Sequence, residues 1–189
     1  MEELSTTRLR LRRWTTDAPD VDFLVDLHSR WEVMRYIGRW PRVASDRSEA
    51  VRRAERYAGM DHPVHGIWAI EDVATGRLHG TLLLKDLPAS GAPVTSPDPA
   101  PSGDTEIGWH LHPDAWGHGY ASEAAARVLE HAFAHGLDQV LAVTHPDNAA
   151  SQRVARRIGM TGLGITGRYY DTTCALFRID RPTEADPAG

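Results

Sequence analysis

One stretch of the chain, residues 104–122, constrains the fold more than any other. It reads DTEIGWHLHPDAWGHGYAS, a strand-like run that passes through Gly117 and Gly119 into an alanine-rich helix. A strand, a glycine loop and a helix in this order present free backbone N–H groups and the positive end of the helix dipole to a ligand. Glycine permits a positive φ and lets a ligand approach the backbone closely. The stretch therefore predicts a phosphate site, and a plain turn is the alternative that the two glycines alone leave open.

The strand before this loop is expected at about residues 105–112, with two chemically different faces. Because side chains alternate along a strand, one face carries Ile107, Trp109 and Leu111, and the other carries Glu106, Gly108, His110 and His112. The helix after the loop is expected over residues 120–135, with an apolar stripe that packs on a sheet. Gly136 stands where the glycine that ends a helix belongs.

Hydrophobic periodicity predicts the other elements. Further strands are expected at residues 6–14, 67–71, 78–85, 140–144, 163–166 and 173–179. Further helices are expected from residue 21 to about 33, from a cap at Ser45 or Asp46 to about residue 58, and from Asn148 or Asp147 to about residue 158. The arginines of the first strand, Arg8, Arg10, Arg12 and Arg13, are interpreted as a solvated face.

Length and composition favour a single domain over residues 1–189. The proline-rich segment 88–103 is expected to be a mobile surface loop, and the tail 181–189 is expected to be disordered. No apolar run approaches the roughly 18 residues that span a bilayer, so we expect a cytoplasmic protein without a membrane partner. The net charge of −5 disfavours a nucleic-acid partner. The one cysteine, Cys174, is interpreted as a buried strand residue.

Three segments resemble one protein family. The segment EIGWHLHPDAWGHGYASEA resembles the acyl-CoA-binding motif of the GNAT N-acetyltransferases, and in particular of the branch that includes the RimJ/RimL ribosomal-protein N-terminal acetyltransferases. TTRLRLRRW near the start and NAASQRVARRIGM later resemble the same branch, so the likeness covers about residues 5–180. The resemblance implies an α/β (α+β) GNAT fold with a mixed, mostly antiparallel, twisted sheet. That fold has about seven strands, about four helices and a V-shaped splay between the fourth and fifth strands.

The resemblance also implies an activity. The chain is expected to be an acetyl-CoA-dependent N-acetyltransferase, a monomer or homodimer, whose acceptor is a protein N-terminus or a small-molecule amine attacking the thioester directly. Acetyl-CoA is then a co-substrate, and no metal is expected. A non-catalytic acyl-CoA-binding sensor on the same fold is the alternative. A dinucleotide-binding domain fits poorly, since its acidic residue follows the second strand, whereas Asp138 precedes the predicted strand 140–144.

By likeness to the family, acetyl-CoA would contact the central strand, the glycine loop and the start of the last helix. The residues concerned are Leu111, His112, Trp116, Gly117, His118, Gly119, Tyr120, Ala121, Ser122, Asn148 and Ser151. Two positions depart from the family pattern, because Asp114 replaces an Arg or Gln and His118 replaces a Lys or Arg. Binding of the phosphates should therefore depend on backbone N–H groups and His118.

Two residues are candidates for the chemistry. Ser151 resembles the serine that donates a proton to the departing thiolate in some members of the branch, and a capping pair with Asn148 is the alternative. Glu106 matches the strand glutamate that accepts the amine proton through water in some GNAT enzymes. A structural ion pair is the alternative for Glu106.

Aromatic residues are candidates for the acceptor site. Tyr36 and Trp40 lie in a segment that lines the acceptor cleft in the family, and packing between helices is an equally good interpretation. Tyr170 is a third candidate, again with simple packing as the alternative.

Three histidine pairs could suggest a metal site: His62 with His65, His110 with His112, and His131 with His135. The first pair has no cysteine or acidic cluster nearby beyond Asp61, and the second lacks a third ligand. The third pair lies near the end of a predicted helix and is interpreted as favourable cations or solvated polar groups, so no metal site is predicted.

Overall fold

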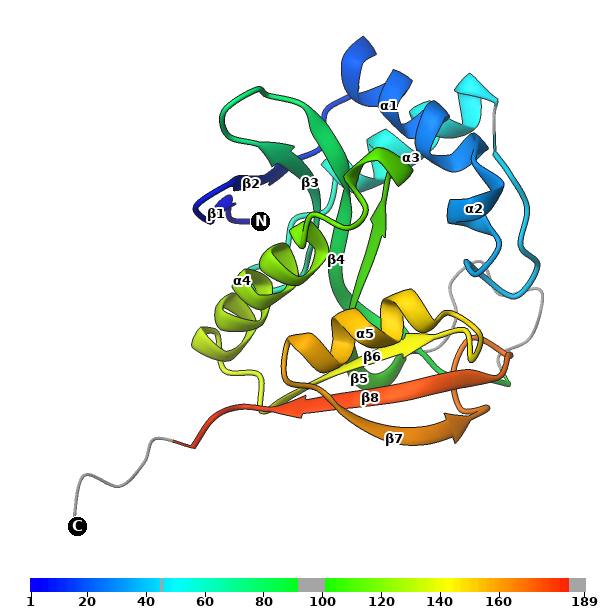
Figure 1. The fold of residues 1–189 in the computed structure, drawn as a ribbon, viewed down its shortest axis with the longest axis vertical. Helices are drawn as coiled ribbons and strands as arrows, with labels where there is room; N and C mark the ends of the chain where they lie inside the picture. Colours follow the sequence, from blue (N-terminus) through cyan, green and yellow to red (C-terminus); the bar gives the residue numbers. More distant parts are fainter. Residues whose placement is uncertain (45, 92–100, 184–189) are drawn as a thin grey trace.

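The computed structural model describes residues 1–44, 46–91 and 101–183 (Figure 1). Ser45 as a helix cap, most of the predicted loop (92–100) and the end of the predicted tail (184–189) lie outside the described residues. In the part of the chain that is described, no helix is both long and apolar enough to cross a membrane.

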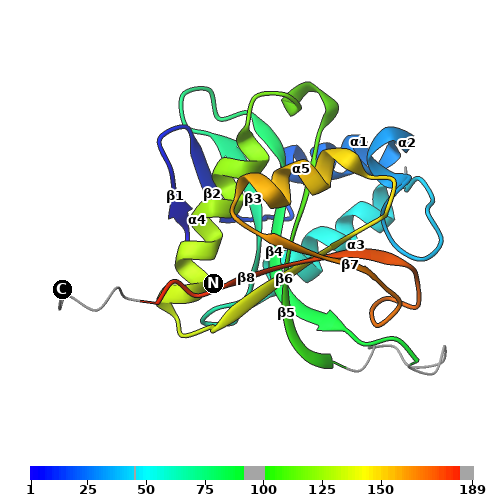
Figure 2. The same ribbon diagram turned by 60° about the horizontal axis from the view of Figure 1, so that its bottom comes forward.

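The described strands form one eight-stranded sheet in the order β1-β2-β3-β4-β5-β6-β8-β7. Their bounds are β1 (Leu4–Ser5), β2 (Leu9–Arg13), β3 (Gly66–Asp72), β4 (Leu78–Pro88), β5 (Pro101–Leu111), β6 (Gln139–Thr144), β7 (Thr161–Thr166) and β8 (Cys174–Asp180). Neighbouring strands are antiparallel except β5 and β6, which are parallel. Figure 2 shows β1 and β2 at one edge of this sheet and β7 at the other. The mixed, mostly antiparallel sheet of the GNAT fold is therefore confirmed.

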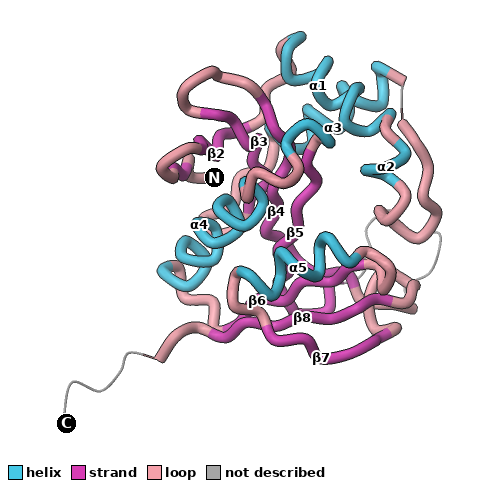
Figure 3. Tube along the Cα trace, in the orientation of Figure 1, coloured by secondary structure: helices cyan, strands magenta, loops and turns pink. Residues whose placement is uncertain are grey.

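Helices cover both faces of the sheet. Their bounds are α1 (Ala18–Ser29), α2 (Trp31–Met34), α3 (Arg47–Ala58), α4 (Tyr120–Ala134) and α5 (Ala149–Arg157), and a 3-10 turn, η1 (Pro113–Ala115), follows β5. Alternation along β3 divides the core, since Trp68 and Ile70 pack in the cluster that includes α4, whereas Ile67 and Ala69 pack with α1 and α3. Figure 3 shows α4 and α5 on the near side of the sheet.

The sheet splays between β5 and β6. The strands β4 and β5 pair along most of their length, from Gly80 with Leu111 to Pro88 with Pro101, whereas β5 and β6 pair only at Glu106 with Leu141. Figure 1 shows the two strands diverging. The splay predicted between the fourth and fifth strands is thus confirmed, with the strand numbers raised by one because β1 precedes the first predicted strand.

The predicted helix 21–33 is in fact two helices. Arg30 is extended (φ −89°, ψ 116°) and separates α1 from α2. The Ser29 hydroxyl donates to the Asp26 carbonyl (2.8 Å), and the Arg30 guanidinium folds back onto the Asp26 carboxylate (2.8 Å). The Ser29 hydroxyl thereby occupies the carbonyl to which the Arg30 amide would donate if α1 continued.

Two further expectations need correction. The strands β4 and β5 are longer than predicted and take up both ends of the expected loop 88–103, with Pro88 and Pro101 paired beyond an irregularity after Asp86, where a ladder tolerates proline. The prediction that the arginines of the first strand are solvated is also wrong for Arg12. Its guanidinium pairs with the buried Asp20 carboxylate of α1 (2.8 Å) and with Glu71 of β3 (2.5 Å).

Helix caps follow the sequence closely. Asp46 accepts a hydrogen bond from the Ser48 amide (2.8 Å) at the start of α3. Asn148 does the same for the Ser151 amide (3.1 Å) at the start of α5. The Asn148 cap therefore fixes where α5 begins after β6.

Candidate active site

The glycine loop presents a row of free amides at the start of α4. Gly117 and Gly119 have φ values of +79° and +81°, which favour glycine. In the described part of the chain, the backbone N–H groups of residues 117–122 find no hydrogen-bond acceptor. A Cβ added at Gly117 would meet nothing within 4 Å, whereas one added at Gly119 would lie 3.6 Å from the Arg8 guanidinium. This arrangement suits an anion such as a phosphate.

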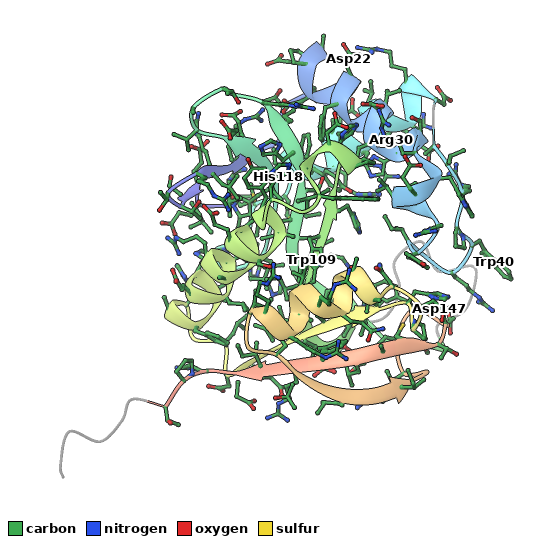
Figure 4. All side chains as sticks on the ribbon, in the orientation of Figure 1. Asp22, Arg30, Trp40, Trp109, His118 and Asp147 are labelled. Atoms are coloured by element: carbon green, nitrogen blue, oxygen red, sulfur yellow. The ribbon has the colours of Figure 1, made fainter. Side chains whose placement is uncertain are left out.

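Cationic and aromatic side chains surround this row of amides. The Tyr120 ring stacks on His79 (4.3 Å between ring centroids) and on His118 (5.5 Å). The Arg8 guanidinium lies over the same ring (4.8 Å to its centroid) and its Nε is held by Glu123 (2.7 Å). Figure 4 shows His118 at the start of α4. Sequence reasoning missed Arg8 here, because four arginines of one strand are indistinguishable until the fold brings one of them to the loop.

The strand β5 directs free backbone groups into the splay. The His112 amide, directly after β5, donates to the His79 carbonyl of β4 (2.8 Å). Because ladder bonds of an antiparallel pair alternate, the N–H groups of Trp109 and Leu111 point the other way, toward β6. The Leu111 carbonyl is occupied by the Trp116 indole N–H (2.9 Å), which pins the loop to the strand.

The vertex of the splay holds Glu106, Lys85 and Tyr170. Glu106 is buried, with Lys85 Nζ 2.7 Å from its Oε1 and the Tyr170 hydroxyl donating to the same oxygen. Lys85 Nζ also donates to the Tyr170 hydroxyl oxygen (2.8 Å). Burial, together with the Glu106 charge, raises the pKa of Tyr170 far above its ordinary value of 10.0, so this hydroxyl stays protonated.

A constrained turn orients Tyr170. Both Tyr170 and Asp171 have positive φ values, 58° and 50°, which are uncommon for residues other than glycine. The turn is held by Asp171, whose carboxylate accepts from the Gly91 amide (2.7 Å) and whose amide donates to the Ser90 hydroxyl (2.9 Å). The fold thus maintains a locally unfavourable backbone that points Tyr170 at Glu106.

Ser151 has a free hydroxyl at the other side of the splay. Its amide is used by the Asn148 cap, but among the described residues its hydroxyl has no hydrogen-bond partner. Capping by Asn148 and a separate role for the Ser151 hydroxyl are therefore compatible.

In the sequence His110 is notable only as one half of a histidine pair. Its Nδ1 is buried without a partner among the described residues, and burial lowers the pKa of His110 to about 3. The side chain of His112 turns to α1 instead, with Nε2 3.0 Å from the Asp26 carboxylate and Nδ1 accepting from the Asp114 amide (3.2 Å). His112 therefore belongs to the packing of β5 on α1, and only its backbone lies near the loop.

The three acceptor candidates end up in different settings. The Tyr36 hydroxyl donates to the Asp147 carbonyl (3.4 Å), and its ring stacks on His145 (5.2 Å) beside the start of α5. Trp40 is 79% exposed and lies at the outer edge of the molecule (Figure 4). Tyr170 alone reaches Glu106.

The segment that follows α2 crosses to the far side of the splay. Arg39 lies 3.8 Å from the Asp171 carboxylate, on the turn that orients Tyr170. Together with the contact of Tyr36 to Asp147, this places residues 35–40 over the connections that follow β6 and β7.

Comparisons with known proteins agree with this architecture. Residues 8–161 match the family model described as an acetyltransferase (GNAT) domain. The chain is 30% identical over 190 residues to the uncharacterized N-acetyltransferase YoaA of Bacillus subtilis, covering 96% of this chain and 98% of that protein.

Solved structures show the same fold. A GNAT-family acetyltransferase from Bacillus anthracis superposes with a TM-score of 0.74 at 20% identity, over 95% of this chain and 99% of that one. The ribosomal-protein acetyltransferase RimL in complex with coenzyme A superposes with a TM-score of 0.70 at 18% identity, over 95% of this chain and 98% of that one.

Proposed function

The chain belongs to the GNAT acetyltransferase family, and from this premise we propose that it transfers the acetyl group of acetyl-CoA to a primary amine by direct attack on the thioester. One observation carries the proposal: the free amides of residues 117–122 lie at the start of α4, directly after the strand that borders the splay. The pyrophosphate of the coenzyme would bind these amides, and the thioester would extend along β5.

Binding of the coenzyme would rest mainly on the backbone. The amides at the N-terminus of α4 carry the positive end of the helix dipole, and Arg8 and His118 add side chains beside them. Asp114 cannot donate to a phosphate, and its carboxylate is paired with Arg77 (2.7 Å). This pair keeps a negative charge partly neutralised near the anion site.

The reacting thioester would lie in the splay. The N–H groups of Trp109 and Leu111 point there and are suited to polarise the carbonyl as negative charge develops on its oxygen. The amine nitrogen would attack the carbonyl carbon, and the C–S bond would break with the electron pair leaving on sulfur. The free hydroxyl of Ser151 is suited to protonate that sulfur.

The amine must lose a proton, and Glu106 is the proposed acceptor, through water. The carboxylate lies at the vertex of the splay, where the Tyr170 hydroxyl donates to it and Lys85 pairs with it. The Lys85 pair also supports the alternative that Glu106 is purely structural, so the roles have to be separated by substitution.

Substitution of Glu106 separates the two interpretations. Glu106→Gln should lower kcat about 100-fold, the usual size of a general-base contribution, and alter the dependence of kcat on pH. Glu71→Gln is the matched control, because it also removes a carboxylate from an ion pair on the sheet, with Arg12 (2.5 Å), but away from the splay. Equal and small effects of both substitutions on kcat would show that Glu106 is structural.

The acceptor would enter beside residues 35–40 and the turn of Tyr170 and Asp171, two segments that the Arg39 and Asp171 side chains connect (3.8 Å). The fold that this chain shares with RimL makes a peptide with a free N-terminus the first acceptor to test. Polyamines and aminoglycosides represent the small-molecule alternative.

The experiment is the release of free thiol from acetyl-CoA in the presence of each amine class. Background from the protein should be low, because burial raises the pKa of the single thiol, Cys174. Turnover that requires one amine class supports the proposal and identifies the acceptor. Tight acetyl-CoA binding without amine-dependent thiol release across the whole panel would favour a non-catalytic sensor.

A further inference from the structure

The last turn of α4 brings two histidines to the first residues of the chain. His131 and His135 are four residues apart on the helix, so their rings share one face. The Glu2 carboxylate completes the group, and one ligand atom from each of the three lies within 4.8 Å of the others. This cluster is at the opposite end of α4 from the glycine loop, roughly 20 Å away along the helix axis.

Hydrogen bonds to backbone carbonyls determine which ring nitrogens are free. His131 Nε2 lies 3.0 Å from the Val64 carbonyl oxygen, and His135 Nδ1 lies 2.8 Å from the His131 carbonyl oxygen. Because a carbonyl oxygen only accepts, both of these nitrogens carry hydrogen. In the neutral rings, His131 Nδ1 and His135 Nε2 are therefore left with free lone pairs.

His131 is arranged as a ligand and not as a cation. The ring is 3% exposed, and its Nε2 is taken by the Val64 carbonyl oxygen (3.0 Å). Its Nδ1 lone pair nevertheless faces the Glu2 carboxylate at 3.5 Å. Two electron-pair donors at this separation are suited to share a positive ion or a hydrogen-bond donor.

We propose that Glu2, His131 and His135 bind a divalent transition-metal ion of the zinc class. Two imidazoles and one carboxylate are a recognised donor set for Zn²⁺, and two histidines at i and i+4 of a helix are a common way to supply it. Each histidine donates its other ring N–H to a backbone carbonyl, as metal-bound histidines usually do. The C-terminal end of a helix dipole also favours a cation.

The third ligand has an anchored backbone and an exposed side chain. The Glu2 carbonyl accepts a hydrogen bond from the buried Trp68 indole (2.8 Å), which anchors this residue to β3. The Glu2 side chain is 57% exposed. Ligand atoms in a tetrahedral zinc site are about 3.4 Å apart, so convergence by about 1 Å completes the site.

The bound ion would be structural with respect to acetyl transfer. It would tie the residue before β1 to the end of α4, and solvent would fill the remaining coordination positions beside the exposed His135. Since the glycine loop lies at the other end of the helix, removal of the ion should lower thermal stability and leave turnover unchanged.

The test uses full-length protein with any purification tag at the carboxyl end, stripped of metal with EDTA and then dialysed. Titration calorimetry with Zn²⁺ alone should give one site per chain, and Co²⁺ should give the visible absorption of a four-coordinate ion. His135→Ala removes an exposed ligand and should weaken Zn²⁺ binding by about 100-fold or more, and Glu2→Gln by about 10-fold or more.

Glu130→Gln is the matched control for Glu2→Gln. It makes the same charge change, but on α4 at a side chain that faces Arg127 (3.7 Å). Zn²⁺ should raise the Tm of the wild type and of this control, but not that of His135→Ala. The absence of stoichiometric Zn²⁺ binding to the wild type, or equal binding by His135→Ala, would overturn the proposal. Loss of acetyl transfer on metal removal would overturn the structural role, and this readout is independent of which amine is the acceptor.

Discussion

The side chain of Ser151 illustrates how one residue serves two purposes. Its amide completes the Asn148 cap of α5, and its hydroxyl has no partner in the described part of the chain. If that hydroxyl protonates the departing thiolate, Ser151→Ala should lower kcat about 100-fold while the amide and the cap remain. The free energy of unfolding should change by less than about 0.5 kcal/mol. Steady-state kinetics and urea unfolding measure the two quantities.

Ser48→Ala is the control for this residue-scale prediction. Ser48 also follows a capping residue, Asp46, and its amide donates to that cap (2.8 Å) in the first turn of α3. Its substitution should leave kcat unchanged. A kcat for Ser151→Ala within about threefold of the wild type would reduce Ser151 to a capping partner, the alternative that the sequence had left open.

At the scale of elements, the connection between β5 and α4 depends on glycine conformation. Gly117 and Gly76 both have positive φ values, +79° and +70°, and a Cβ at either position would meet nothing within 4 Å. Substitution by alanine should therefore destabilise both variants by a similar amount, about 1 kcal/mol, through backbone strain alone.

The two glycine variants should differ in function. Gly117 is in the row of free amides, whereas Gly76 lies in the turn between β3 and β4. Gly117→Ala should raise the KM for acetyl-CoA about 10-fold, because reorienting even one or two amides weakens a phosphate site. Gly76→Ala should leave this KM unchanged. The same KM in both variants would contradict the assignment of the loop to the coenzyme.

At the scale of the whole molecule, buried histidines make stability depend on pH. Burial lowers the pKa of His28 to about 4, and the Arg53 guanidinium adds to the effect while Glu49 opposes it. The pKa of His110, on the strand that borders the splay, is lowered to about 3. In the unfolded chain both groups titrate near 6.5.

The sign of the pH dependence follows from these shifts. Well above pH 6.5 both histidines are neutral in the folded and unfolded states, so they take nothing from the stability. Between pH 6.5 and about 4 the unfolded chain binds protons that the folded protein excludes, so the free energy of unfolding decreases as the pH is lowered. Each group should cost about 2 kcal/mol between pH 7 and pH 5.

Urea unfolding in EDTA at a series of pH values measures this loss. His28→Gln should remove the part of this loss that His28 contributes, about 2 kcal/mol. A free energy of unfolding that is constant from pH 7 to pH 5 would contradict the burial of neutral histidines between α1 and the sheet.

Features that depend on neighbouring residues could be predicted from the sequence. Gly117 and Gly119 adopt the positive φ expected of a ligand loop, α4 begins at Tyr120, and Asp46 and Asn148 cap their helices. Local steric preferences and hydrogen bonds to nearby amides decide these features. The resemblance to the GNAT family supplied the rest of the architecture, including the splay.

Other local features were misjudged because competing interactions decided them. At the break before Arg30 the Ser29 hydroxyl occupies the Asp26 carbonyl, and no glycine or proline marks the position. The strand β1 has two residues, too few for any periodicity to be read. Arg8 and Arg12 look alike in the sequence, yet one reaches the glycine loop and the other bridges two elements.

What the sequence by itself determined is the set of local structures and the family, since both depend on residues close together in the chain. Only the tertiary structure decided which distant side chains meet. Tyr170 reaches Glu106 across 64 positions and Lys85 across 85, and Glu2 joins His131 and His135 from the other end of the chain. The strand register and the packing of α4 on the sheet produce these encounters, and no local pattern of side chains encodes either.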